Sequence, residues 1–171
     1  MNVHDKWGVA PTRSLEWRFE AKHRPRMPHK LICLDWYLTF EKDKKPNVEE
    51  LQQLFHITGL KFDNIYHDGV HQALSSATGI FTARYDGRLL GFARVHNDDA
   101  GHRLGELVVH QHYQRRGIGK SLLSMAEQRA KDDGGKLLYL QATAESKSYY
   151  EERGYQLTWN GLYAKYFHQS F

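Results

Sequence analysis

Residues Gln114–Lys120 read QRRGIGK, and this stretch decides the fold because it joins a strand pattern to a helix pattern. The residues before it, Leu104–His110 (LGELVVH), form a short apolar run with adjacent valines, typical of a strand buried on at least one face. From Ile118 to Ala130, apolar residues recur at helical spacing. Gly117 and Gly119 lack a Cβ atom, so the backbone can approach a bulky anion, at which the first N–H groups of the helix point. The sequence therefore predicts a strand, a phosphate-binding loop and a helix.

Two better-known phosphate loops do not fit these positions. The nucleoside-triphosphate loop that ends in Gly-Lys-Ser needs a glycine where Gln114 stands. The dinucleotide-binding fingerprint needs a small residue where Leu122 stands. A basic loop that binds nothing is a further interpretation of an isolated Gly-x-Gly. The strand before the loop and the helix after it favour phosphate binding.

The motif QRRGIG resembles the Q/R-x-x-G-x-G/A signature of the GNAT superfamily, the acetyl-CoA-dependent N-acetyltransferases. A second segment, Ser148–Tyr155 (SYYEERGY), follows a predicted strand at Lys136–Ala142 and is similar to the family's FYEKLGF segment. The resemblance covers roughly Leu31–Phe167. We therefore expect a basic N-terminal extension over residues 1–30 and a GNAT-like acetyltransferase domain over residues 31–171.

Composition agrees with one soluble globular domain that carries an extension. The chain has 171 residues, of which 40% are hydrophobic and 26% charged. No apolar run is long enough to span a membrane and no signal peptide is recognisable, so a cytoplasmic protein is expected. The net charge of +4 is too modest to favour nucleic-acid binding, although the N-terminal segment is basic. Cys33 has no partner for an internal disulfide, and the 11 histidines show no ligand spacing, so no metal site is predicted.

Local signals divide the rest of the chain into helices and strands. Helices are predicted from Pro46 to Gly59, over Gly69–Ala77, from Ile118 to the Asp132–Gly135 stop and over Ser146–Arg153. Strands are predicted at Leu31–Phe40, Gly79–Tyr85, Arg88–Val95, Leu104–His110, Lys136–Ala142, Tyr155–Trp159 and Leu162–Phe167. This pattern predicts an α/β fold with a mixed sheet and helices on both faces. The resemblance implies a mostly antiparallel sheet that splays open beside Leu104–His110.

The resemblance also implies that acetyl-CoA is the cosubstrate and enters this splay. Its pantetheine arm would pair with the open strand edge, while its pyrophosphate would reach the loop. The residues expected to bind it are Leu107, Val108, Val109, Gln114, Arg115, Arg116, Gly117, Ile118, Gly119, Lys120 and Ser121.

The implied reaction is direct transfer of acetyl from the thioester to an amine in a ternary complex. Tyr150 occupies the position of the family's tyrosine that protonates the coenzyme sulfur; a packing aromatic is the other interpretation. Glu106 is the candidate base, on the strand face of Leu104 and Val108 by two-residue alternation, or else an ordinary ion-pair partner. His110 and His112 are further candidates for the base. The backbone N–H near Val108 or Val109 is expected to stabilise the oxyanion.

The acceptor side is less defined by the sequence. In this family the first two helices and their connection build the pocket, where Phe62, Asp63 and Tyr66 could hold an amine or simply cap and pack a helix. A small-molecule amine is favoured over a protein, and an aromatic C-terminus could support a homodimer. The alternative function is a non-catalytic acyl-CoA-binding protein, or a nucleic-acid or partner-binding protein with the same fold.

Overall fold

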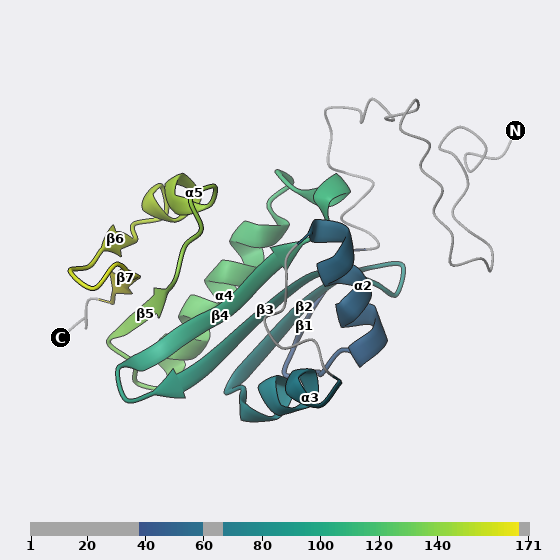
Figure 1. Cartoon of the computed structure of the whole chain (residues 1–171), viewed down its shortest axis with the longest axis horizontal. Coiled ribbons are helices and arrows are strands. Elements are labelled where there is room, and N and C mark those ends of the chain that lie inside the picture. Colours follow the sequence, from purple (N-terminus) through teal and green to yellow (C-terminus); the bar gives the residue numbers. More distant parts are fainter. Residues whose placement is uncertain (1–37, 60–66, 168–171) are drawn as a thin grey trace, which may run out of the picture. The chain divides into compact units, whose positions relative to one another are not determined.

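The computed structural model describes residues 38–59 and 67–167, with side chains from residue 69 in the second range (Figure 1). Within them, seven strands form one sheet in the order β1-β2-β3-β4-β5-β7-β6. The strands are β1 (Leu38–Lys42), β2 (Gly79–Tyr85), β3 (Arg88–Asp98), β4 (Gly101–Val109), β5 (Leu137–Leu140), β6 (Gln156–Leu157) and β7 (Tyr163–Tyr166). The helices are α2 (Val48–Thr58), α3 (His67–Ser76), α4 (Ile118–Asp132) and α5 (Lys147–Glu151). All neighbouring strands are antiparallel except β4 and β5, which are parallel.

Caps and turns set the element boundaries where the sequence predicts them. Asn47 caps α2 through the Glu49 N–H, and the Glu50 side chain accepts from the Asn47 N–H, which completes a capping box. Between β2 and β3, Asp86 and Gly87 have φ of 49° and 78°, as a two-residue hairpin turn requires. The predicted break between the strands Gly79–Tyr85 and Arg88–Val95 is confirmed, and α2 begins at Val48, two residues after the predicted Pro46.

The helices cover both faces of the sheet, as predicted. On one face, α4 and α5 pack over a core that includes Val95, Leu104 and Leu138. On the other face, α2 and α3 pack over a second core that includes Phe92 and Val108 (Figure 1). Side chains of one strand therefore alternate between an α4 side and an α2/α3 side.

The sheet opens between β4 and β5. The two strands pair only at His102 with Leu138 and at Arg103 with Tyr139, both near the start of β4. Farther along, β4 stays paired with β3 up to Val109 and separates from β5 (Figure 1). The β5 side of residues 104–109 is thus an open strand edge, and the splayed sheet is confirmed.

A β-bulge in β4 corrects one expectation. Leu104 pairs with Val95 and Glu106 pairs with Arg94, so Gly105 is an extra residue. Strict alternation predicts that Leu104 shares a face with Glu106, but the bulge breaks the alternation and turns Leu104 to the α4 side. Glu106 remains on the α2/α3 side with Val108.

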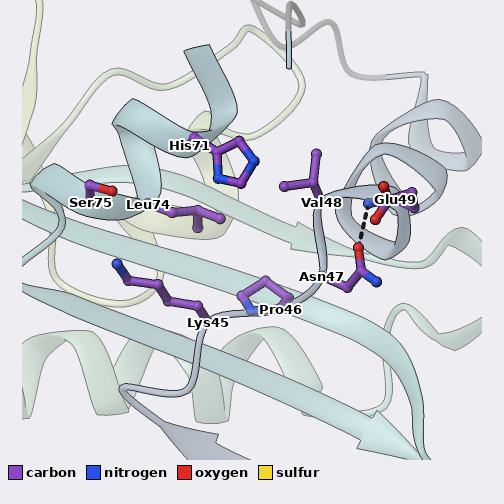
Figure 2. Close-up of a pocket in the computed structure, with 8 residues that line it drawn as sticks. All are labelled: Lys45, Pro46, Asn47, Val48, Glu49, His71, Leu74 and Ser75. Carbon is purple, nitrogen blue, oxygen red and sulfur yellow. Dashed lines mark hydrogen bonds between the residues drawn. The ribbon is translucent and has the colours of Figure 1, made fainter. Parts of the chain in front are cut away.

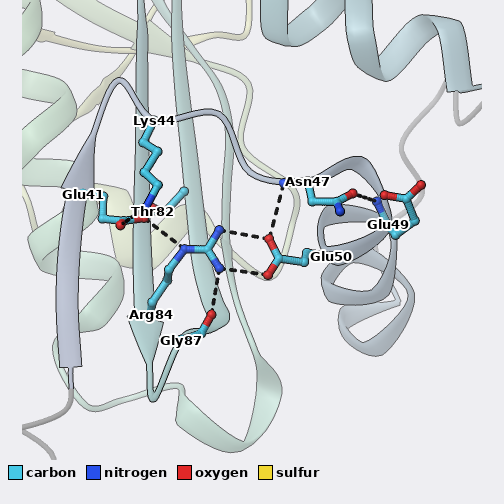
Figure 3. A network of polar contacts seen from close by, with 8 residues as sticks. All are labelled: Glu41, Lys44, Asn47, Glu49, Glu50, Thr82, Arg84 and Gly87. Atoms are coloured by element: carbon cyan, nitrogen blue, oxygen red, sulfur yellow. Dashed lines mark hydrogen bonds and ion pairs between the residues drawn. The ribbon is translucent and has the colours of Figure 1, made fainter. Parts of the chain in front are cut away.

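An ion-pair network fixes α2 against the sheet. The Arg84 guanidinium donates to both carboxylate oxygens of Glu50 at 2.9 Å and to Glu41 at 2.9 Å (Figure 3). It also donates to the carbonyl of Gly87 at 2.9 Å. Arg84 therefore links the first turn of α2 to β1 and to the hairpin turn.

Some predictions lie outside the described residues or change in detail. Residues 1–30, Cys33 and the first part of the Leu31–Phe40 strand lie outside them, and β1 is described from Leu38. The short 3-10 helix η2 (Gln111–Tyr113) is not predicted from the sequence. None of the helices in the described ranges is both long and apolar enough to cross a membrane.

Candidate active site

The predicted phosphate loop lies at the N-terminus of α4. Gly117 is the N-cap with a φ of 84°, and Arg115 also lies in the left-handed region with a φ of 59°. No side chain caps this end of the helix. The Ser121 N–H donates to the Gly117 carbonyl at 3.0 Å, so the amides of residues 118–120 precede the first intrahelical bond and have no intrahelical partner. Such a run of free amides forms an anion-binding concavity.

The side chains around the loop add positive charge and anchor it. Arg115 and Lys120 are exposed, and Ser121 is half-buried. The Arg116 guanidinium lies over the Tyr113 ring, 5.4 Å from its centroid. Ile118 is buried in the core on the α4 side, so its side chain holds the loop in place.

The open edge of β4 presents alternate backbone groups to the gap. The His110 N–H donates to the Leu90 carbonyl of the β3 side at 2.8 Å, so by two-residue alternation Val108 also pairs with β3. The N–H groups of Leu107 and Val109 therefore face the gap. The Gln114 side-chain amide already donates to the Val109 carbonyl at 3.0 Å, which ties the loop to the strand end.

Tyr150 of α5 lies with its ring in the core on the α4 side of the sheet. It is 7% exposed and makes edge-to-face contacts with Tyr149 and Tyr155, whose ring centroids lie 5.2 Å and 5.6 Å away. Burial raises the pKa of Tyr150 above its ordinary value, so the phenol stays protonated at neutral pH. Its hydroxyl has no hydrogen bond to a described residue and is not among the fully enclosed polar atoms.

Glu106 is held in a two-point ion pair. The Arg94 guanidinium donates to its two carboxylate oxygens at 2.6 Å and 2.8 Å, and donates a third bond to the Ala73 carbonyl of α3 at 3.1 Å. The two side chains are 12% and 21% exposed. A carboxylate in this two-point pairing is fixed in position.

A family model decides the assignment: the model of the acetyltransferase (GNAT) domain matches residues 50–166. The chain belongs to the GNAT acetyltransferase family. The match spans the splayed strands, the α4 loop and the Tyr150 helix, so the predicted GNAT membership is confirmed.

Solved structures share the GNAT fold at low sequence identity. A GNAT family acetyltransferase from Streptococcus pneumoniae is 24% identical with a TM-score of 0.59, over 70% of this chain and 88% of its own. N-acetylglutamate synthase from Neisseria gonorrhoeae, complexed with coenzyme A and N-acetyl-glutamate, is 17% identical with a TM-score of 0.65, over 78% and 36%. PaiA N-acetyltransferase from Thermoplasma acidophilum, complexed with coenzyme A, is 19% identical with a TM-score of 0.55, over 75% and 99%. No curated protein matches the sequence.

Tyr149, the neighbour of Tyr150, also extends toward the predicted phosphate loop. Its hydroxyl is enclosed and has no hydrogen-bond partner among the described residues. A Cβ atom placed on Gly119 would lie 3.0 Å from this hydroxyl, so Tyr149 reaches the phosphate loop. Arg153 stacks 3.6 Å over the Tyr149 ring centroid and donates to its carbonyl at 2.6 Å. The pair of adjacent tyrosines is the sequence signal that could have indicated a second role.

His110 and His112, which follow β4, form a local turn. His110 Nδ1 accepts from the His112 N–H at 3.2 Å, which places the proton of neutral His110 on Nε2. Burial, and then His112, lower the pKa of His110, so its imidazole is neutral at pH 7. It stays an alternative base.

The predicted acceptor residues Phe62, Asp63 and Tyr66 lie outside the described residues. A cavity of about 410 Å³ lies between the N-terminus of α2 and α3 (Figure 2). Its lining residues are Lys45, Pro46, Asn47, Val48, Glu49, His71, Leu74 and Ser75. None of them belongs to β4, to β5 or to the phosphate loop, so this cavity is separate from the splay.

Proposed function

We propose that this protein is an N-acetyltransferase that moves acetyl from acetyl-CoA to an amine in a ternary complex. The observation that carries the proposal is the open edge of β4, which leads from the β4–β5 junction to the uncapped N-terminus of α4. The GNAT family match and the coenzyme A complexes of two structural relatives support it.

The residues present fit the coenzyme. A Cβ atom on Gly117 would meet nothing within 4 Å, so the loop leaves room for a pyrophosphate. The amides of residues 118–120 would bind it, with charge from Arg115, Arg116 and Lys120 and a hydroxyl from Ser121. The pantetheine amides would pair with Leu107 and Val109, whose backbone groups face the gap. The enclosed hydroxyl of Tyr149 would form a hydrogen bond with the same ligand.

The proposed chemistry is one acyl transfer. The amine nitrogen bonds to the thioester carbon, the carbon–sulfur bond breaks, and the thiolate leaves with its electron pair. The N–H of Val109 stabilises the oxyanion, or else that of Leu107, because the other predicted donor, Val108, pairs with β3. Tyr150 donates a hydrogen bond or its proton to the thiolate. Glu106 accepts the amine proton through water, because Arg94 already binds both of its oxygens.

Thiol release from acetyl-CoA across a panel of amines tests the proposal. Changing Tyr150→Phe should lower kcat by about 10²–10⁴-fold, the usual contribution of a general acid. The matched control is Tyr163→Phe, another buried tyrosine, whose hydroxyl bonds to Glu151 at 2.9 Å. Unchanged kcat in Tyr150→Phe would refute the acid assignment.

Two other outcomes would replace the function itself. Coenzyme binding without thiol release for any amine would indicate the non-catalytic acyl-CoA-binding alternative. Salt-dependent retention on nucleic acid that is lost when residues 1–30 are deleted would favour the nucleic-acid alternative.

A further inference from the structure

A cluster of polar side chains covers the α2/α3 side of β3, β4 and β5, beside the splay. Its members are Arg94, His96 and Asp98 of β3, Arg103 and Glu106 of β4, and Tyr139 of β5. Their neighbours in the chain, among them Val95, Leu104 and Leu138, pack on the α4 side, which places the cluster on the opposite face. We call these six residues the polar face.

Four members of the polar face form hydrogen bonds or ion pairs with one another. Arg94 binds Glu106 through both carboxylate oxygens. The Tyr139 hydroxyl donates to Asp98, which also accepts from the Ala100 N–H at 2.9 Å. The two carboxylates of the polar face therefore already have strong donors.

Arg103 and His96 have no such partners. Arg103 Nε and His96 Nδ1 are both enclosed, and neither has a hydrogen-bond partner among the described residues. The two residues are directly opposite each other across β3 and β4. Arg103 also has no ion pair with a described residue within 4.0 Å. An enclosed guanidinium N–H that lacks a hydrogen-bond acceptor lowers the stability of the folded protein. Arg103 Nε and His96 Nδ1 are therefore suited to a ligand that supplies a hydrogen-bond acceptor.

The charges of Arg103 and His96 indicate which chemical group would supply the missing hydrogen-bond acceptor. Burial and then the positive charge of Arg94 and Arg103 lower the pKa of His96, so His96 is neutral at pH 7 and Arg103 carries the charge. A guanidinium matches a carboxylate with two parallel hydrogen bonds. Neutral His96 can donate a further bond when its proton is on Nδ1.

We propose that Arg103, with His96 beside it, binds a carboxylate of the acceptor, so that the acceptor is an amino acid or a similar amino-carboxylate. This inference rests on the proposed acetyltransfer. Glu106 stands three residues farther along β4, at most about 10 Å away at the rise of a strand. The amine of a zwitterion would then lie by Glu106 at the open edge, and its carboxylate would lie by Arg103 where β4 and β5 join.

Matched acceptor pairs test this inference in the full-length protein. Initial rates of thiol release are measured with each amino acid and with its decarboxylated amine, such as lysine with cadaverine and phenylalanine with 2-phenylethylamine. The wild-type kcat/KM should favour the carboxylate-bearing member by at least about tenfold, as expected for hydrogen bonds to a charged group. Turnover confined to amines without a carboxylate, or equal turnover of both members, would overturn the inference and leave the acetyltransferase proposal intact.

The variant Arg103→Gln isolates the subsite. It should raise KM for the amino acid by about 10–100-fold, with no change in KM for the decarboxylated amine or for acetyl-CoA. Lys136→Gln removes one exposed positive charge near the start of β5 and serves as the control, which should change neither KM. An equal effect of Arg103→Gln on both acceptors would indicate a structural role and overturn the inference. Absence of thiol release with every amine would instead refute the proposed function.

Discussion

Two glycines with a left-handed backbone conformation lie at the ends of α4. Substituting each one by itself distinguishes an effect on coenzyme binding from an effect on helix stability. Gly117 has a φ of 84° at the N-terminus and Gly134 has a φ of 76° just after the C-terminus. A Cβ atom at either position would meet nothing within 4 Å. The variants Gly117→Ala and Gly134→Ala therefore share one cost, the strain of alanine in the left-handed region, and differ in their distance from the phosphate loop.

That shared cost can be estimated. Alanine in the left-handed region costs roughly 1–2 kcal/mol. For a domain of this size each kcal/mol lowers the Tm by about 2–4 °C. Both variants should therefore unfold at a Tm lower by about 2–8 °C, with similar shifts of the urea midpoint.

Only Gly117→Ala should weaken coenzyme binding. Gly117 is the N-cap residue directly before the free amides of residues 118–120, so strain at this position would tilt the first of them away from the ligand. Loss of one hydrogen bond to a charged group is about 1.5–3 kcal/mol, so the Kd for coenzyme A should rise by about 10–100-fold. Calorimetric titration of both folded variants measures this difference. Equal affinities in the two variants would refute the placement of the pyrophosphate at this loop.

Two further variants test the neighbouring contacts. Tyr149→Phe removes an enclosed, unpaired hydroxyl, so the urea midpoint should not fall. The Kd for coenzyme A should rise by roughly 3–10-fold. Unchanged affinity would contradict a contact between Tyr149 and the coenzyme. The hydrogen bond from Arg84 lowers the pKa of Glu50 below its ordinary value of 4.5, so this stabilisation is present above about that pH and is lost as the pH falls through the pKa of the folded state. Glu50→Gln should lower the free energy of unfolding at pH 7 by about 1–3 kcal/mol and should make that free energy less dependent on pH in the acid range. The control Glu49→Gln should do neither. Equal urea midpoints of the two variants from pH 7 down through the acid range would contradict the coupling between the Arg84–Glu50 contact and stability.

Features with local causes were predictable from the sequence. The capping residues of α2, the Asp86-Gly87 turn and the glycine at the start of α4 each act within a few residues of the chain. Their preferences hold in almost any fold. The positions of the hairpin and of the phosphate loop followed from them.

Features that depend on a distant partner were not predictable. Arg94 and Glu106 are 12 residues apart and meet only because β3 and β4 pair in one register. The Tyr149 hydroxyl meets Gly119 from a different helix, and no spacing rule connects the two positions. The same limit applies to the face of Leu104, since a bulge cannot be recognised without the opposite strand.

The bulge at Gly105 makes the two proposed acceptor contacts compatible. Arg103 and Glu106 are three positions apart, so a regular strand would turn them to opposite faces. The extra residue places both on the α2/α3 side, opposite His96 and Arg94. A Cβ atom on Gly105 would lie 2.8 Å from Arg94 Nη2, so a larger residue there would shift the guanidinium that holds Glu106. A single irregular residue therefore both fixes the carboxylate beside the open edge and aligns it with the unpaired arginine.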